Sequence, residues 1–330
     1  MGCHRNSTGF PCDPVPHVST HTTVLLDQAV EALAIKPGGV YVDGTFGRGG
    51  HSRLILSQLG NNGRLVAFDR DPAAVAAGKA IEDRRFHIVH ASFSRIKEML
   101  CQLGVDRVDG VLLDLGVSSP QLEEACRGFS FQVDGPLDMR MNPDEGVPAS
   151  EWLKAVPETR LEEVIKNYGE ERFAKQIARA IAEARARQPL ITTHQLASIV
   201  AAVIPAHKRE KKQNPATRTF QAIRLYLNQE LEKLSLALPQ CVEILNAGGR
   251  LVTISFHSLE DRIVKRFMRA SAKCDVLPRK LPLRLQEVRL LSRPTLHLIG
   301  RAIRPDEAEI AANPRARSAV MRVAERIDLF

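Results

Sequence analysis

The chain has 330 residues, about twice the length of a typical domain, which predicts two folded units. Its composition, 44% hydrophobic and 25% charged with a net charge of +8, is that of a globular protein. These values exclude a disordered chain, a collagen-like repeat and a miniprotein held together by disulfides.

The first 23 residues contain prolines, polar residues and only isolated apolar residues, so they lack the apolar centre of a signal peptide. No run of 18 apolar residues occurs, and we expect no membrane segment. The six cysteines are scattered without a C-x-x-C pair, which argues against structural zinc and favours a reducing compartment. We expect a cytoplasmic protein with no metal site and a disordered extension over residues 1–19.

Between residues 40 and 114 the sequence alternates between strand and helix patterns. Short apolar runs predict strands, and apolar residues at helical spacing or a Pro at a helix start predict helices. The strands are expected over 40–43, 64–69, 86–90 and 108–114, and helices over 49–59, from 71 onward, and over 94–103. Repeated units of this length predict an α/β fold with a parallel, doubly wound sheet.

The alternation stops after about residue 118. A loop rich in Gly, Pro and Asp is followed by helical patterns, and an apolar stripe from Phe220 to Leu238 predicts one long helix. A strand is expected over 250–255. We therefore predict a core over 20–118 and 227–330, interrupted by a helical insert over 119–226. A separate C-terminal α+β domain is the alternative.

A glycine-rich turn follows the first strand, where residues 43–51 read DGTFGRGGH. Glycines at this edge of a sheet let the backbone approach a ligand closely. The dinucleotide pattern G-x-G-x-x-G, counted from Gly47, fails because Ser52 holds its last position, and the chain has no P-loop. The remaining pattern, D-x-x-x-G-x-G-G, is typical of S-adenosylmethionine sites; an ordinary glycine-rich turn is the alternative.

Two further acids end strands. Asp69 follows the second strand, where a carboxylate can accept both hydroxyls of an adenosine ribose or, alternatively, cap a helix. Asp114 ends the fourth strand and could face the cofactor's methionine end, hold the acceptor amine or form a local turn. Further along, Ser258 and Asp261 match a capping box, and His257 just before that helix is a candidate base.

Positive charge is concentrated in two places. Residues 262–326 contain 16 Lys or Arg and 6 Asp or Glu, a local balance of +10 that leaves about −2 for the rest. A tighter basic cluster spans 208–224. Such clusters predict a polyanionic partner, although a solvated basic surface is the alternative. With 5% aromatic residues, no stacking platform for single strands is evident.

Eight segments together resemble the ribosomal RNA small subunit methyltransferase H family, also called MraW. They extend from about residue 20 to the C-terminus, in the family's order. The segments are His21–Leu26, Asp43–Ser52, Asp109–Gln121, Arg127–Met141, Tyr168–Phe173, Asn214–Gln221, Ser255–Arg262 and Asn313–Ser318. The extension over residues 1–19 departs from the family pattern, and we assign it no role.

The resemblance implies a class I methyltransferase core with a helical insert. The implied activity is methyl transfer from S-adenosylmethionine to the N4 amine of a decoding-centre cytidine in 16S rRNA of the small ribosomal subunit. The resemblance does not decide whether the protein forms a homodimer. The cofactor contacts that it implies are Gly49, Gly50, His51, Asp69, Phe93, Asp114 and Gln121.

The N4 amine of cytidine is a poor nucleophile, so the reaction needs a group that accepts its hydrogens. It also needs close alignment of the reactants. Many DNA amino-methyltransferases carry an acceptor motif after the fourth strand. In this chain Asp114-Leu-Gly-Val stands in its place, so analogy with those enzymes does not identify the acceptor. The candidates are Asp114, Asp134, Asp138 and His257. An enzyme of the same fold acting on DNA or another RNA, a nucleotide-dependent oxidoreductase and an RNA-binding assembly factor remain as alternatives.

Overall fold

The computed structural model describes residues 23–209, 214–273 and 294–327. The chain divides into two compact units. The sheet unit spans Thr22–Gly116 and Leu231–Phe330, and the helical unit contains Val117–Glu230. The extension predicted over residues 1–19 lies outside the described residues. In the described part of the chain, no helix combines the length and the apolar character needed to cross a bilayer.

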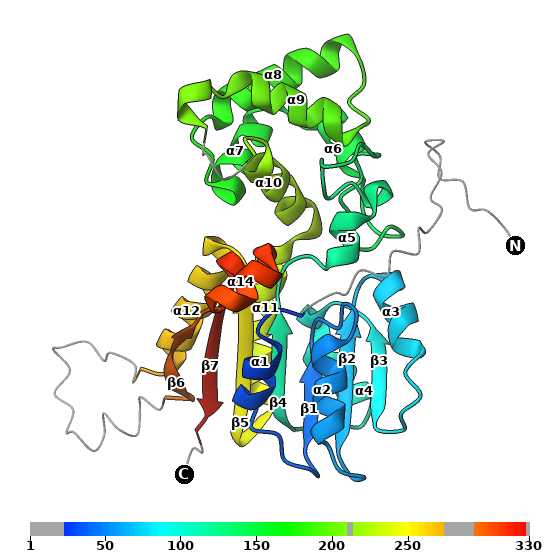
Figure 1. The fold of residues 1–330 in the computed structure, drawn as a ribbon, viewed down its shortest axis with the longest axis vertical. Helices are drawn as coiled ribbons and strands as arrows, with labels where there is room; N and C mark the ends of the chain where they lie inside the picture. Colours follow the sequence, from blue (N-terminus) through cyan, green and yellow to red (C-terminus); the bar gives the residue numbers. More distant parts are fainter. Residues whose placement is uncertain (1–22, 210–213, 274–293, 328–330) are drawn as a thin grey trace, which may run out of the picture. The chain divides into compact units, whose positions relative to one another are not determined.

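The sheet unit is built on one seven-stranded sheet in the order β3-β2-β1-β4-β5-β7-β6 (Figure 1). Strands β1 to β5 run parallel, whereas β7 is antiparallel to both β5 and β6. This arrangement confirms the predicted α/β class I methyltransferase fold. The strands are β1 Val40–Asp43, β2 Arg64–Asp69, β3 Phe86–His90, β4 Val108–Asp114, β5 Leu245–Ser255, β6 Leu296–Ile303 and β7 Val320–Arg326.

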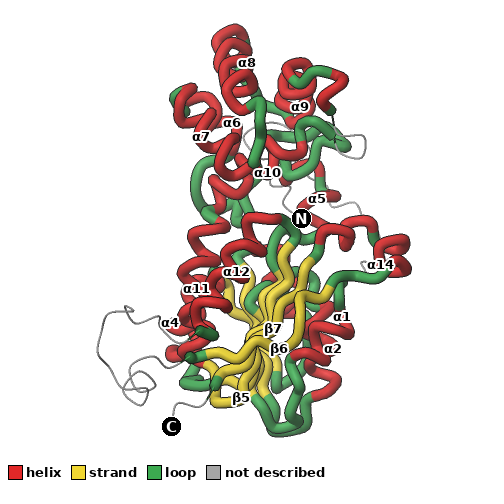
Figure 2. The backbone as a smooth tube through the Cα atoms, turned by 90° about the vertical axis from the view of Figure 1, so that its left-hand side faces the viewer, coloured by secondary structure: helices red, strands yellow, loops and turns green. Residues whose placement is uncertain are grey.

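Helices cover both faces of this sheet, so both faces of its strands are apolar. Along β2, Val66 and Phe68 pack into the core shared with α4, α11 and α12, while Leu65 packs into the core shared with α1 and α2. Figure 2 shows these two helical layers on opposite sides of the strands. The helices are α1 Leu26–Ala32, α2 Gly50–Gln58, α3 Pro72–Lys79, α4 Ile96–Gln102, α11 Glu230–Ile244, α12 Ser258–Ser271 and α14 Glu307–Ala312.

Strand β6 is the edge of the sheet beyond β7. Its pairing with β7 shifts register between Ile299 and Ile303, around Gly300, whose φ is 65°. Glycine tolerates this positive φ, which produces a local bulge in the strand. The ladder is therefore interrupted within the edge strand.

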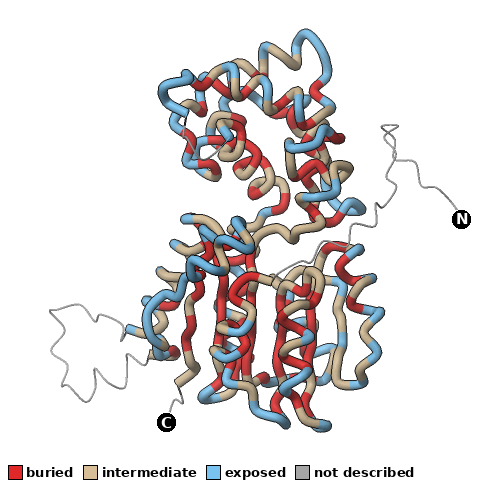
Figure 3. Tube along the Cα trace, viewed as in Figure 1, coloured by how far each residue is buried: buried red, intermediate tan, exposed pale blue. Residues whose placement is uncertain are grey.

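The helical unit has its own apolar core, which includes Ile177 and Ile181 as their i, i+4 spacing predicts. Figure 3 shows buried residues on the inward sides of its helices and along the strands of the sheet unit. Its only bridge between extended segments among the described residues joins Pro136 to Thr192. The helices are α5 Ser119–Glu123, α6 Ala149–Ala155, α7 Glu158–Gly169, α8 Ala174–Arg187, α9 Thr193–Val203 and α10 Thr217–Asn228.

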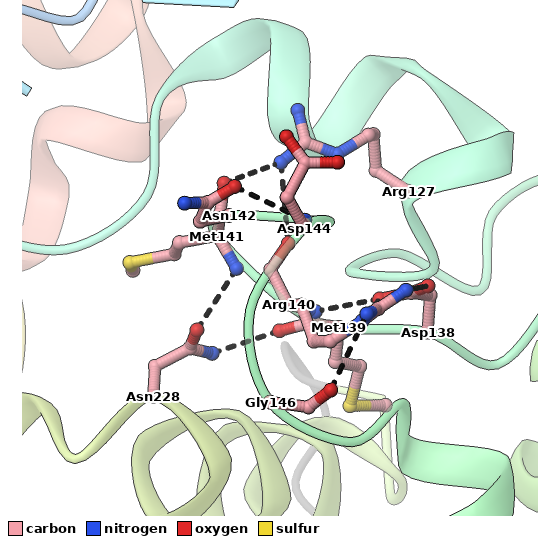
Figure 4. A network of polar contacts seen from close by, with 9 residues as sticks. All are labelled: Arg127, Asp138, Met139, Arg140, Met141, Asn142, Asp144, Gly146 and Asn228. Atoms are coloured by element: carbon pink, nitrogen blue, oxygen red, sulfur yellow. Dashed lines mark hydrogen bonds and ion pairs between the residues drawn. The ribbon is translucent and has the colours of Figure 1, made fainter. Parts of the chain in front are cut away.

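The single long helix predicted through Phe220 and Leu238 is wrong. The helix breaks at Gln229, whose φ of 52° ends α10 before α11 begins. The buried amide of Asn228 accounts for the break: its Oδ1 accepts from the Met141 backbone N–H at 2.8 Å, and its Nδ2 donates to the Met139 carbonyl at 2.8 Å (Figure 4). These contacts are long-range in sequence, so apolar periodicity does not predict them.

Candidate functional site

The glycine-rich turn after β1 is organised by a buried acid. Asp43 is 1% exposed; its Oδ2 accepts from the Ser52 hydroxyl at 2.6 Å and its Oδ1 from the Thr45 backbone N–H at 3.1 Å. Burial raises the pKa of Asp43, and these two hydrogen bonds oppose that effect. Ser52, which excluded the dinucleotide pattern, thus fixes the start of α2 against the end of β1.

The glycines of this turn have conformations that suit them to a close ligand approach. Gly49, the residue before α2, has a φ of 75°, and a Cβ there would lie 2.6 Å from the Phe46 ring. Gly49 has no side chain that could cap the N-terminus of α2, an end of a helix that suits an anionic group of a ligand. Phe93 lies beside the same turn: its Cβ is 3.3 Å from where a side chain at Gly44 would begin.

Asp69, at the end of β2, is tied to the same turn. Its Oδ2 accepts from the Gly47 backbone N–H at 2.8 Å, and its Oδ1 accepts from the Asp71 backbone N–H at 2.9 Å. Burial raises the pKa of Asp69 to about 6, despite these two bonds. Each carboxylate oxygen can accept a second hydrogen bond, so the group can still bind a pair of hydroxyls.

Asp114, at the end of β4, carries an unpartnered buried atom. Its backbone N–H donates to the Thr45 hydroxyl at 2.6 Å, and its Oδ2 lies 3.7 Å from His51 Nδ1. Its Oδ1 is buried and has no hydrogen-bond partner among the described residues. Burial, followed by the nearby carboxylates of Asp43 and Glu260, raises the pKa of Asp114 well above its usual range. An unsatisfied buried oxygen of this kind marks a place where a ligand donor can bind.

The start of α12 corrects the predicted capping box. His257, not Ser258, is the capping residue, and its Nδ1 accepts from the Glu260 backbone N–H at 3.4 Å. Asp261 instead forms an ion pair with Arg322 at 2.7 Å. Strand β5 ends at Ser255, as the sequence predicts, although it begins five residues earlier than expected, at Leu245.

Glu260 is the site residue that sequence reasoning missed. It is 2% exposed; its Oε2 accepts from the Phe256 backbone N–H at 2.9 Å, and its Oε1 lies 3.2 Å from His257 Nε2. It lies three residues after the capping residue, which is the spacing of a capping box shifted by one position. That spacing, read from His257, is the signal that could have found it. His257 Nδ1 therefore caps this helix, whereas its Nε2 faces Glu260 but has no hydrogen-bond partner among the described residues.

Three predicted site residues lie in the helical unit, where each makes local contacts. Gln121 Oε1 accepts from the Ser118 backbone N–H at 2.9 Å and completes the capping box of α5. Asp134 Oδ1 accepts from the His194 backbone N–H at 2.9 Å, in the first turn of α9. Asp138 forms a two-pronged ion pair with Arg140, at 2.8 and 2.7 Å (Figure 4).

Within the sheet unit, the structure thus brings together the ends of β1, β2, β4 and β5. The predicted residues gathered there are Gly49, Gly50, His51, Asp69, Phe93, Asp114 and His257. Among the described residues, no group of three or more His, Cys, Asp or Glu side chains is placed to hold a metal ion. In the basic cluster over 208–224, residues 210–213 lie outside the described part of the chain.

Comparison of the sequence with known proteins finds a matching family and similar relatives. The model of the MraW methylase family matches residues 18–327. A ribosomal RNA small subunit methyltransferase H from Nitrosospira multiformis is 71% identical over 93% of this chain and 98% of its own length, and one from Nitrosomonas europaea is 65% identical over the same shares.

Among solved structures, an rRNA methylase from Streptococcus thermophilus aligns over 92% of this chain and 93% of its own, with a TM-score of 0.39 and 9% identity. That likeness is too weak to support an argument. The family match covers nearly the whole chain, including the glycine-rich turn and the ends of β2, β4 and β5. The chain belongs to the MraW methylase family.

Proposed function

We propose that this protein is an S-adenosylmethionine-dependent methyltransferase that modifies the N4 amine of a decoding-centre cytidine in 16S rRNA of the small ribosomal subunit. Membership of the MraW methylase family supports an rRNA substrate, as do the relatives, which are ribosomal RNA small subunit methyltransferases. The observation that carries the chemistry is the buried, unpartnered Oδ1 of Asp114 beside the glycine-rich turn.

The residues present fit an adenosine-bearing sulfonium cofactor. The glycine-rich turn at the N-terminus of α2 suits a carboxylate, and the Asp69 carboxylate suits the two ribose hydroxyls. Phe93 offers an apolar surface for the adenine beside this turn. When bound, S-adenosylmethionine supplies an electrophilic methyl group.

Asp114 is the best of the four candidate acceptors. Asp134 and Asp138 have their carboxylate oxygens engaged, at the start of α9 and with Arg140 respectively. Of the remaining two, Asp114 Oδ1 and His257 Nε2 are both buried without a hydrogen-bond partner in the described residues. His257 Nε2 lies 3.2 Å from the Glu260 carboxylate, which leaves Asp114 as the stronger candidate. Its carboxylate would accept a hydrogen bond from the amine and then take the proton that the nitrogen loses as the N–C bond forms.

The raised pKa of Asp114 suits this role. A carboxylate of higher pKa is a stronger base than an ordinary aspartate, so it accepts a proton from the methylated amine more readily. The fixed position of its backbone, held by the Thr45 hydroxyl, sets where that oxygen lies. The nucleotide must be unstacked to reach it, at a cost of a few kcal/mol.

A methyl-transfer assay tests the proposal. Labelled S-adenosylmethionine is incubated with small ribosomal subunits lacking the modification, with naked 16S rRNA and with DNA, and the nucleosides are then separated by mass. We expect N4-methylcytidine in RNA. Labelling of DNA alone, or of a carbon or ribose position, would contradict the proposal.

A further inference from the structure

The outer face of α12 carries a line of positive charge. Its inner face, with Val264 and Met268, is buried against the sheet. Successive spacings of four and three residues place three exposed cations on one side of the helix, over ~10 Å of its length, and a fourth follows two residues after its end. These cations, here called the basic stripe, are Arg262, Arg266, Arg269 and Lys273.

Arg266 and Arg269 of the basic stripe have no acidic counterpart on α12. Residues 262–273 contain no Asp or Glu, and the two acids of the first turn are engaged, Asp261 with Arg322 and Glu260 with the Phe256 backbone. Within the part of the chain that the structure describes, Arg266 and Arg269 form no ion pair. Like charges spaced by three or four residues destabilise a helix, so α12 bears an electrostatic cost.

Three exposed cations on other helical segments are paired with an acid one turn away. Arg95 pairs with Glu98 at 2.6 Å, Arg160 with Glu163 at 2.8 Å and Arg179 with Glu183 at 2.9 Å. The helix dipole favours cations in the last turn of α12, which accounts for Arg269 but not for Arg266 in the middle. Within the described residues the charge of Arg266 and Arg269 is therefore unbalanced, which favours an anionic partner.

The basic stripe starts close to the candidate site. Helix α12 begins directly after the carboxyl end of β5, and Arg262 lies half a turn beyond Glu260, whose charge acts on Asp114. From there the helix runs along the sheet to Ser271, whose carbonyl accepts from the Thr295 backbone N–H at 2.9 Å. A strand with one nucleotide in the site has this row of cations within reach.

We propose that the basic stripe binds the phosphate backbone of the substrate RNA next to the target nucleotide. The inference rests on the proposed function and deepens it by assigning the RNA surface. Evenly spaced cations fit the repeating charge of a nucleic acid backbone, and guanidinium groups hold phosphates by two parallel hydrogen bonds. The exposed stripe itself contains no apolar anchor of the kind that a protein partner uses.

The test is a double variant, Arg266→Ala/Arg269→Ala, against Lys79→Ala/Arg84→Ala, which removes the same charge near α3 from exposed positions. Binding to transcribed 16S rRNA and to purified small subunits is measured between 50 and 200 mM NaCl. We expect the α12 variant to bind RNA about tenfold more weakly, with a salt slope shallower by about 1.4 to 1.8, because two phosphate contacts are lost. The control variant should change binding less than threefold.

Binding of S-adenosylmethionine, measured on both variants, should match the unaltered protein, since the replaced side chains are exposed. The α12 variant should melt no lower than the unaltered protein, because alanine relieves the like-charge repulsion within the helix. Equal affinity and slope in the α12 variant would overturn the inference, as would an equal loss in the control. If the α12 variant lost affinity for small subunits but not for naked rRNA, the partner of the basic stripe would be an acidic protein surface, and the inference would also be overturned. If the unaltered protein bound neither RNA nor subunits, the proposed function itself would fail.

Discussion

Three carboxyl groups at the ends of β1, β2 and β4 have raised pKa values, and burial is the largest cause for each. They are Asp43, Asp69 and Asp114. Asp43 and Asp69 accept hydrogen bonds from backbone N–H groups, which oppose the rise in pKa. Asp114 has one buried oxygen without a hydrogen-bond partner among the described residues. Asp43 therefore builds the turn, whereas Asp69 and Asp114 retain capacity for a ligand.

The first prediction concerns Asp69. Asp69→Ala should weaken S-adenosylmethionine binding by ~10- to 100-fold, because it removes a charged acceptor from two hydroxyls and releases the Gly47 N–H. Isothermal titration calorimetry measures this. Asp83→Ala is the control, since Asp83 lies in a turn where its hydrogen bonds to Arg85 lower its pKa to about 2. Equal affinity in the Asp69 variant would remove this residue from the cofactor site.

The same residue predicts a pH dependence. Hydroxyl donors bind the ionised carboxylate better than the protonated one, and the pKa of Asp69 is about 6. Cofactor affinity should therefore rise as the pH increases from 5 to 7 and then level off. The affinity of the Asp69→Ala variant should not rise in this way. This comparison separates the titration of Asp69 from that of the cofactor. A flat profile in the unaltered protein would contradict the assignment.

The second prediction concerns Asp114 in catalysis. Asp114→Asn keeps the shape but cannot take a proton, so kcat should fall by ~10²- to 10⁴-fold while cofactor affinity changes little. Single-turnover methylation with calorimetry separates the two. Unchanged kcat with weakened cofactor binding would instead assign Asp114 to the ammonium group of the cofactor.

Regular elements of the sheet unit could be predicted from the sequence because their signals are local. Short apolar runs ended by glycine or acid locate β1, β2 and β4, and the turn after β1 is recognisable from its glycines. The break at Gln229 could not be predicted, because it depends on Met139 and Met141, which are distant in sequence. The sequence pattern places the capping residue of α12 at Ser258, one position after His257, and therefore misses Glu260.

The third prediction concerns that break. Gln229 has a φ of 52°, a conformation that costs a residue with a Cβ ~1 kcal/mol and glycine little. Gln229→Gly should raise the free energy of unfolding by ~0.5–1 kcal/mol, and Gln229→Val should lower it by more than 1 kcal/mol, as measured by urea denaturation. If valine were tolerated as well as glycine, the break would not depend on this conformation.

At the scale of the whole molecule, the buried acids link stability to pH. The pKa of Asp114 is raised in the folded state, so the folded protein binds this proton more tightly than the unfolded chain. As the pH rises from about 4, the unfolded state ionises first, and the free energy of unfolding falls. The site is therefore maintained at a cost in stability, as is common where a binding group must remain unsatisfied.

The fourth prediction follows from this linkage. Without cofactor, Asp114→Asn should raise the melting temperature at pH 7.5 by several degrees and have little effect below about pH 3, where the acid is protonated in both states. Asp83→Asn should do the reverse at pH 7.5, since Asp83 is stabilised by Arg85. Differential scanning fluorimetry across this pH range is sufficient. A destabilised Asp114→Asn protein at pH 7.5 would refute the linkage.

The bulge around Gly300 bears on self-association. An edge strand with an unbroken row of free N–H and carbonyl groups is a template onto which another chain can add. Here the shifted register of β6 interrupts that row, and exposed Arg301 and Arg304 bring charge to it. A second molecule could therefore not add a regular strand to β6, which protects this edge of the sheet from fibril-like stacking.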